Sequence, residues 1–236
     1  MGFLQLMIAA IVPSYVLGSL NGAIIVSKLF YRKDIRDYGS KNAGLTNFYR
    51  VFGKGGAALV FLIDMLKTVM PVLFGGWLFS NYLGMRPPQA FPFGWFIQES
   101  FFGQALSGFA VMIGHCFPLF HKFRGGKGVM AIGSIIIVID WRLALISWGV
   151  FILVILITRY VSLGAMLGSI AFPSFMPLFY DGIIGKAEHN VIIMCVILVI
   201  IRHIPNIRRL VKGEESKFSL KIKRKHHHES SDTGQR

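Results

Sequence analysis

The sequence predicts an all-α integral membrane protein with about seven transmembrane helices. Of its 236 residues, 54% are hydrophobic and only 15% are charged. The apolar residues fall into long blocks, and a helix needs roughly 20 such residues to cross about 30 Å of hydrocarbon at about 1.5 Å per residue. Residues 1–213 are therefore expected to form a single polytopic membrane domain, and residues 214–236 a basic, disordered tail.

Seven apolar blocks can be drawn in order along the chain. The first is too long for the apolar core of a signal peptide and has no basic residue before it, so it is expected to remain as a span. The second contains Asp64 and Lys67 on one helix face, where they would neutralise each other or meet a polar partner inside the bundle. Asp140, Trp141 and Arg142 alone must supply the polar turn between the fourth and fifth spans, so a six-span interpretation stays open. The blocks cover residues 3–29, 56–80, 101–120, 127–142, 143–158, 162–179 and 189–204.

The formal net charge of +14 is distributed unevenly between the loops. With an odd number of spans, most lysines and arginines fall on one side of the membrane, in segments 30–55, 121–126, 159–161 and 205–236. The loops on the other side, 81–100 and 181–188, hold only Arg86 and Lys186. Because basic loops stay in the cytoplasm, we expect the N-terminus outside and the C-terminus inside. The basic tail then indicates membrane lipid as a partner, and no nucleic acid.

A loop rich in phosphate-binding groups follows the first block, and we call residues 39–50 the first loop. It reads Gly-Ser-Lys-Asn-Ala-Gly-Leu-Thr-Asn from Gly39 to Asn47, and Arg50 follows. Glycines let the backbone approach a ligand, hydroxyl and amide groups add hydrogen bonds, and a guanidinium grips an oxyanion with a planar fork. The first loop therefore predicts an anionic substrate, with an ordinary Gly- and Asn-rich turn as the alternative.

A second motif precedes the fourth block. It comprises Gly-His-Cys-Phe-Pro at residues 114–118 and Phe-Arg-Gly-Gly-Lys-Gly-Val at residues 123–129, and we call residues 125–128 the glycine segment. This segment opens into an apolar helix whose free N–H groups and dipole favour phosphate, and Lys127 adds a point charge. The Gly-x4-Gly-Lys-Ser/Thr spacing of a Walker loop is missing, and a structural hinge is the alternative.

A third polar stretch, residues 202–215, follows the last block, and we call it the C-terminal segment. It begins Arg-His-Ile-Pro-Asn-Ile-Arg-Arg-Leu and ends with Gly213, Glu214 and Glu215. His203 and Asn206 are spaced to project from one side of a helix end, and both can hydrogen-bond a hydroxyl or a phosphate. A basic cluster of this kind is also common at any cytoplasmic span end.

Together these motifs resemble the bacterial membrane-bound, acyl-phosphate-dependent glycerol-3-phosphate acyltransferases. The resemblance covers nearly the whole chain and rests on Gly-Ser-x-Asn-x-Gly-x-Thr-Asn-x3-Arg, Gly-His-x2-Pro with Phe-x-Gly-Gly-Lys-Gly, and Arg-His-x2-Asn-x2-Arg-Leu. It implies a seven-span enzyme of the bacterial cytoplasmic (inner) membrane, with its active site on the cytoplasmic side. Such an enzyme moves a fatty acyl group from acyl phosphate to the 1-hydroxyl of glycerol 3-phosphate, giving lysophosphatidate and inorganic phosphate, the first step of phospholipid synthesis. No cofactor and no metal is implied.

The resemblance also implies roles for individual residues. The acyl-phosphate head is assigned to Ser40, Asn42, Gly44, Thr46 and Asn47. Glycerol 3-phosphate is assigned to Arg50, Lys127, Ser162, His203 and Asn206. Of these residues, Ser40, Arg50, Lys127, His203 and Asn206 are the expected catalytic set, and Gly125, Gly126, Gly128 and Glu215 are expected to support them.

Several details stay open at the level of sequence. The proton acceptor is either His203 or a phosphate of the substrate. Glu214 and Glu215 compete for the acidic position after the third motif. Lys41 and Leu45 depart from the family pattern, which often has Gly and Ala there.

A transporter or channel for a small phosphorylated anion is the alternative function. Intramembrane Asp64 and Lys67, with a cavity lined by cations, would serve it too. Against this interpretation, the polar motifs gather at one membrane face and the chain has no internal repeat. Transporter sites lie near the midplane between repeated halves.

Overall fold

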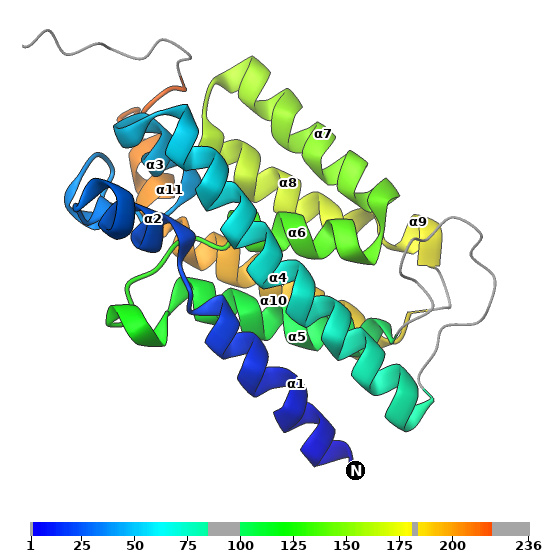
Figure 1. Cartoon of the computed structure of the whole chain (residues 1–236). Coiled ribbons are helices and arrows are strands. Elements are labelled where there is room, and N and C mark those ends of the chain that lie inside the picture. The colour runs from blue at the N-terminus through cyan, green and yellow to red at the C-terminus, as the bar shows by residue number, and fades with distance from the viewer. Residues whose placement is uncertain (1, 85–99, 181–183, 219–236) are drawn as a thin grey trace, which may run out of the picture.

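The computed structural model describes residues 2–84, 100–180 and 184–218, and in these ranges the regular elements are helices. Most of the predicted outer loop 81–100 and the tail beyond residue 218 lie outside the described residues. Figure 1 labels the α-helices, and two short 3-10 helices lie in the connections α2–α3 and α5–α6 of the described chain. In order they are α1 (Phe3–Gly18), α2 (Gly22–Tyr31), η1 (Ile35–Asp37), α3 (Leu45–Phe52), α4 (Lys54–Leu83), α5 (Phe101–Cys116), η2 (Leu119–His121), α6 (Val129–Ile139), α7 (Trp141–Thr158), α8 (Val161–Phe175), α9 (Pro177–Tyr180), α10 (Lys186–Arg202) and α11 (Ile204–Val211).

The described helices provide five or six candidate spans, fewer than the predicted seven. Five helical stretches are each long and apolar enough to cross a membrane: Phe3–Tyr31, Lys54–Leu83, Phe101–His121, Trp141–Thr158 and Val161–Tyr180. A sixth candidate arises if α10 and α11, which are bent by 54° relative to each other, count as one span. The block at 127–142 forms only α6, whose 11 residues extend about 16 Å. Gly128 is left-handed before α6, and Asp140 is extended after it and accepts a hydrogen bond from Arg142 N to begin α7. Two local backbone breaks therefore shorten this block to half a bilayer.

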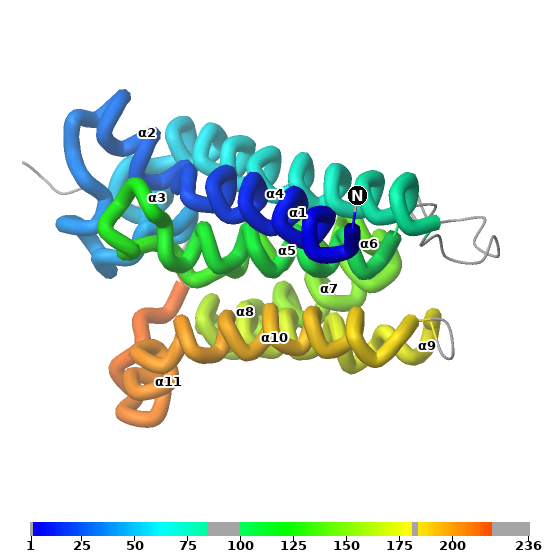
Figure 2. The backbone as a smooth tube through the Cα atoms, turned by 90° about the horizontal axis from the view of Figure 1, so that it is seen from below, coloured from blue at the N-terminus to red at the C-terminus, as the bar shows by residue number. Residues whose placement is uncertain are grey.

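The helices pack as two groups joined through the middle. Helices α1, α4 and α5 contact one another, α8 contacts both α7 and α10, and the groups meet where α10 packs on α5. Figure 2 shows α8 and α10 as one row below α1 and α5. Helix α6 contacts α4, α5, α7 and α8, and its apolar side chains, such as Ile135 and Ile139, lie in the main core with Met112, Phe172 and Val199.

The outer faces of the bundle carry large apolar side chains. Leu29, Leu156, Ile157 and Leu178 are each more than 70% exposed. A surface of this kind suits hydrocarbon, because lipid tails are as apolar as leucine.

All three polar motifs lie at one end of the bundle. Helices α2, α3 and α11 gather there, whereas the N-terminus and α9 lie at the opposite end (Figures 1 and 2). Contacts join segments that are far apart in sequence: Arg36 Nη1 donates to His121 O at 2.9 Å, and Phe218 N donates to Arg159 O at 2.7 Å. We call this the polar end, and the convergence predicted for these segments is present.

Candidate active site

Glu215 is the centre of a polar cluster at this end. Its Oε1 accepts hydrogen bonds from Ser162 Oγ at 2.9 Å and Asn206 Nδ2 at 2.7 Å, and its Oε2 accepts one from Arg209 Nε at 2.7 Å. Burial raises the pKa of the Glu215 carboxyl, but the hydrogen bonds from Asn206, Arg209 and Ser162 outweigh it and hold the pKa below its usual value. Glu214 is exposed, so Glu215 is the acidic side chain that engages the site.

Lys127 joins the same cluster from the glycine segment. Its Nζ donates to Asn206 Oδ1, while the Nδ2 group of that amide donates to Glu215. Because the amide oxygen can only accept and the amide nitrogen can only donate, Asn206 is oriented between a cation and an anion. Burial lowers the pKa of Lys127 to about 8, with Glu215 opposing the shift and nearby arginines adding to it. Lys127, Ser162, Asn206 and Glu215, predicted from separate motifs, are thus brought together.

His203 lies at the bend between α10 and α11 and is 2% exposed. Its Nδ1 is 2.8 Å from Val199 O, and a carbonyl oxygen can only accept, so Nδ1 carries the ring proton. In the neutral ring, Nε2 is then the nitrogen with a free lone pair. The backbone therefore makes Nε2 the nitrogen of His203 that can act as a base.

The turn of the first loop is held by Asn47. Its Oδ1 accepts from Ser40 N at 2.8 Å, and its Nδ2 donates to Tyr38 O and Asn42 O at 3.0 Å each. A Cβ on Gly39 would lie 2.3 Å from Asn47 Oδ1, and the Gly39 φ is +59°, so this position requires glycine. Asn47 is therefore occupied in shaping the loop, whereas the side chain of Ser40 is exposed.

The rest of the first loop leads into α3. Gly44 is the extended residue that precedes α3, and Thr46 lies exposed in its first turn. Lys41 has a φ of +58°, in the left-handed region, where a non-glycine residue costs about 1–2 kcal/mol. This backbone requirement explains why glycine suits the position at which the sequence departs from the family pattern.

Arg50 connects the first loop with the C-terminal segment. It lies exposed in the last turn of α3, and its Nη2 is 3.5 Å from Ser216 Oγ, next to Glu215. Among the described residues, the structure thus places a guanidinium beside the cluster of Lys127 and Asn206 without a carboxylate partner of its own.

The backbone of the glycine segment is held by Arg202. The Arg202 Nε donates to Gly126 O at 3.0 Å and its Nη2 donates to Gly125 O at 3.1 Å, while Gly126 N donates to His115 O at 3.1 Å. Gly128 then opens α6. Sequence reasoning treated Arg202 as part of an interfacial basic cluster and missed this role, since nothing in its local sequence distinguishes it from its basic neighbours.

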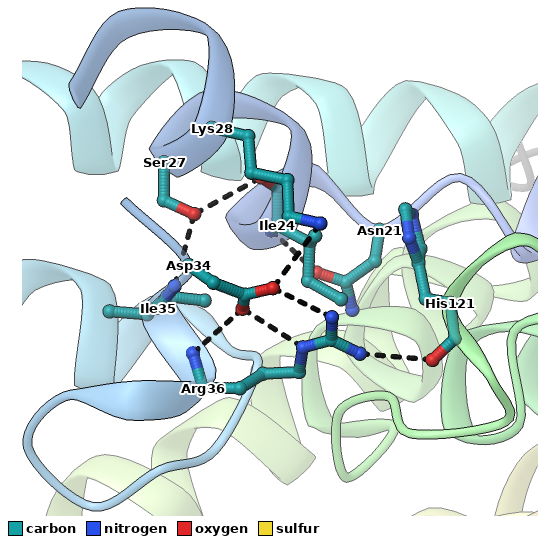
Figure 3. A network of polar contacts seen from close by, with 8 residues as sticks. All are labelled: Asn21, Ile24, Ser27, Lys28, Asp34, Ile35, Arg36 and His121. Carbon is teal, nitrogen blue, oxygen red and sulfur yellow. Dashed lines mark hydrogen bonds and ion pairs between the residues drawn. The ribbon is translucent and has the colours of Figure 1, made fainter. Parts of the chain in front are cut away.

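A further network, also missed from the sequence, braces the approach to the first loop (Figure 3). Asp34 Oδ2 pairs with Arg36 Nη2 at 2.6 Å and with Lys28 Nζ at 3.3 Å, and Arg36 also donates to His121 O. The Arg36 hydrogen bond is the largest influence on Asp34 and holds the pKa of that carboxyl well below its usual range. The network ties the α2–η1 connection to η2, which leads into the glycine segment.

Comparison with known proteins agrees over nearly the full chain. The family model described as glycerol-3-phosphate acyltransferase matches residues 8–213. A glycerol-3-phosphate acyltransferase of Thermoanaerobacter pseudethanolicus is 36% identical over 211 residues, which are 88% of this chain and 93% of the relative.

Solved structures give the same result. The crystal structure of PlsY, an integral membrane glycerol 3-phosphate acyltransferase, in its glycerol 3-phosphate form superposes with a TM-score of 0.73 at 31% identity. That alignment covers 92% of this chain and 95% of PlsY. The lysophosphatidic acid form gives a TM-score of 0.73 at 29% identity, over 90% and 95% of the two chains.

These matches favour an enzyme over the transporter alternative. The matched residues 8–213 include the three motifs and nearly all of the apolar helices. This chain is a multi-pass membrane acyltransferase that belongs to the glycerol-3-phosphate acyltransferase family.

Proposed function

We propose that this protein transfers a fatty acyl group from an acyl phosphate to the 1-hydroxyl of glycerol 3-phosphate, at the cytoplasmic face of the membrane. The observation that carries the proposal is the cluster of Lys127, Asn206 and Glu215 with Arg50 beside it. Both substrates are phosphate anions, so a site that binds them together needs cations held in place. The related PlsY was solved in a glycerol 3-phosphate form and a lysophosphatidic acid form, which correspond to a substrate and a product of this transfer.

The charge distribution supports a cytoplasmic polar end. Among the described residues, most basic side chains belong to this end, whereas Arg142 and Lys186 belong to the opposite one. The positive-inside rule then orients the chain with the site in the cytoplasm and the N-terminus outside. Membrane lipid surrounds the helices, and the acyl chain of the donor enters from this phase.

The chemistry is a direct acyl transfer. The 1-hydroxyl oxygen attacks the acyl carbonyl carbon and forms the new ester bond, while the bond from that carbon to the phosphate oxygen breaks and inorganic phosphate leaves with the electron pair. An acyl phosphate is already activated, so the residues need mainly to position the reactants and offset their charge. Arg50 and Lys127 serve this purpose on the glycerol 3-phosphate side, with Ser162, His203 and Asn206.

The first loop binds the phosphate that leaves. Ser40 and Thr46 are exposed there, and the turn held by Asn47 presents the backbone of Asn42 and Gly44. Ser40 acts as a hydrogen-bond donor and not as a nucleophile. If it formed an acyl-enzyme, the kinetics would be ping-pong and acyl phosphate would label the protein through Ser40.

Two groups are candidates for accepting the proton of the attacking hydroxyl: Nε2 of His203 and an oxygen of the departing phosphate. His203→Gln separates them. A loss of kcat of about a hundredfold or more assigns the proton to His203, whereas a largely retained kcat assigns it to the phosphate.

The acyl-donor assay tests the function itself. Purified protein with labelled glycerol 3-phosphate should form lysophosphatidate from palmitoyl phosphate and none from palmitoyl coenzyme A. Product from the coenzyme A ester alone would overturn the proposed donor. A folded sample that forms no product from either donor would overturn the enzyme assignment.

A further inference from the structure

Three ionisable side chains meet inside the bundle, away from the cluster around Glu215. Asp64 and Lys67 of α4 and His115 of α5 are 1%, 6% and 3% exposed. Lys67 Nζ lies 2.8 Å from Asp64 Oδ1. The sequence left open whether these two charges pair with each other or meet a polar partner; both occur, and the partner is His115.

The contacts of Lys67 determine the state of His115. Lys67 Nζ lies 2.8 Å from Asp64 Oδ1, 2.9 Å from Leu20 O and 2.9 Å from His115 Nδ1, so each of its three protons has an acceptor. An ammonium group has donors only. His115 Nδ1 is therefore the acceptor, and the ring carries its proton on Nε2.

The Nε2 edge of His115 faces the glycine segment. A Cβ on Gly126 would lie 2.1 Å from His115 Nε2 and 2.8 Å from Ala43 O of the first loop. Gly126 N also donates to His115 O at 3.1 Å. The residue directly before Lys127 is thus held between this imidazole and the first loop.

The same group of side chains also anchors the start of the first loop. Gly22 N donates to Asp64 Oδ1 at 3.1 Å, and Leu20 O accepts from Lys67, so both sides of the α1–α2 break are held. Asn21, within that break, donates from Nδ2 to Ala43 O at 3.2 Å. The same group of buried side chains therefore holds both the first loop and the glycine segment.

Stability alone gives little reason to keep these charges. A buried ion pair often contributes no more than apolar side chains of the same volume. Asp64 Oδ2 is a buried oxygen that has no hydrogen-bond partner among the described residues, which adds to the cost.

We propose that Lys67 and His115 are positioning residues for the acyl transfer: Lys67 holds His115 with its proton on Nε2, and this edge of the ring holds Gly126 so that Lys127 reaches Asn206 and the substrate phosphate. Asp64 pairs with Lys67 and holds its ammonium group at this position. The inference rests on the proposed role of Lys127 in binding glycerol 3-phosphate.

Two replacements of His115 separate a structural role from a positioning role. In His115→Asn, the amide oxygen can accept from Lys67 as Nδ1 does, but the edge that meets Gly126 is lost. In His115→Gln, the longer side chain returns an amide group to the space beside Gly126 that Nε2 occupies. His115→Asn should keep the wild-type thermal midpoint and raise the KM for glycerol 3-phosphate about five- to tenfold. Its kcat and its KM for acyl phosphate should change little. His115→Gln should bring the KM for glycerol 3-phosphate most of the way back to the wild-type value. Ser107→Ala, which is also buried in α5, is the matched control: it should leave both KM values and kcat unchanged and should not lower the thermal midpoint, because its hydroxyl has no hydrogen-bond partner among the described residues.

Nitrogen-15 NMR of labelled His115 tests the tautomer without any substrate. The wild-type protein should show the proton on Nε2, and Lys67→Met should remove this preference. A proton found on Nδ1 would overturn the arrangement. The kinetic measurements also require the variant Lys127→Gln. A wild-type KM for glycerol 3-phosphate in Lys127→Gln would overturn the proposed role of Lys127. A raised KM in Lys127→Gln together with a wild-type KM in folded His115→Asn would overturn the positioning role alone.

Discussion

Replacing Glu215 by alanine removes one carboxylate that accepts from three side chains, Ser162, Asn206 and Arg209. The three donors come from two helices, α8 and α11, so the carboxylate holds the C-terminal segment against the start of α8. Its loss leaves the Asn206 amide and the Ser162 hydroxyl without that acceptor. We expect both stability and substrate binding to fall.

The magnitude follows from burial. Ser162 and Asn206 are 6% and 4% exposed, and a hydrogen bond to a charged group contributes about 1.5–3 kcal/mol in such surroundings. The Arg209 side chain is 42% exposed, so its ion pair adds only about 0–1 kcal/mol. Taking the low end for the two buried donors, Glu215→Ala should lose about 3 kcal/mol.

The assay combines a thermal midpoint in detergent with steady-state kinetics. A loss of about 3 kcal/mol corresponds to a fall of roughly 6–12 °C for a chain of this size. The KM for glycerol 3-phosphate should rise as well, because Asn206 no longer orients Lys127. In the wild-type protein the pKa of Glu215 lies below its usual value, so this stabilisation is present above pH 4.5 and is lost as the pH falls through the lower folded-state pKa.

Glu214→Ala is the matched control, since Glu214 is the exposed neighbour. It should stay within about 0.5 kcal/mol of the wild type. Glu215→Gln should lie between the two, because its oxygen can still accept from Ser162 and Asn206 while its amide nitrogen meets the Arg209 donor. Equal midpoints and equal KM values for Glu215→Ala and Glu214→Ala would refute the reasoning.

Three further perturbations are tested by simpler measurements. The pKa of Lys127 is about 8 and its charged form binds phosphate, so kcat/KM for glycerol 3-phosphate should fall as the pH rises through about 8. Lys127→Arg should move this fall in kcat/KM to higher pH, because the guanidinium stays charged. A fall at the same pH in Lys127→Arg would contradict the assignment. Arg50→Ala should lose about 2–4 kcal/mol of transition-state stabilisation, or about 30- to 900-fold in rate. The exposed Arg208→Ala should lose little, and near wild-type turnover of Arg50→Ala would remove Arg50 from the site. Lys41→Gly should raise the thermal midpoint, since it relieves a left-handed backbone worth about 1–2 kcal/mol, partly offset by the entropy of glycine in the unfolded chain; a lower midpoint would show that the lysine side chain stabilises the loop.

Much of the fold could be predicted because hydropathy is a local property. Each predicted apolar block contains helix in the described residues, and the uneven charge correctly grouped the polar segments at one end. In the described residues five or six helices qualify as candidate spans by length and composition, against the seven predicted, because block length measures apolar content and not helix length. Gly128 and Asp140 shorten α6 through their backbone conformations, which a sum of apolar residues does not register.

The site was predictable as a set of motifs and only in part as a set of contacts. Sequence motifs singled out Lys127 and Asn206 as candidates for binding a polar ligand, yet they lie 79 positions apart, and the packing of α10 against α5 and α6 joins them. Glu214 and Glu215 are equivalent in sequence, and the turn after α11, where Gly213 has a φ of +70°, brings Glu215 to Asn206. Asn47 was expected to bind the acyl-phosphate head, and the structure engages its amide in the turn itself.

By itself, then, the sequence determined a helical membrane protein, the end of the bundle at which its polar segments meet and the family whose motifs it carries, because these depend on composition, spacing and local order. The tertiary structure alone decided which side chains share a hydrogen bond. That Lys67 meets His115, and that His115 meets Gly126, depends on how α4, α5 and the glycine segment pack together. Such contacts arise between residues that are distant along the chain, where no local pattern can record them.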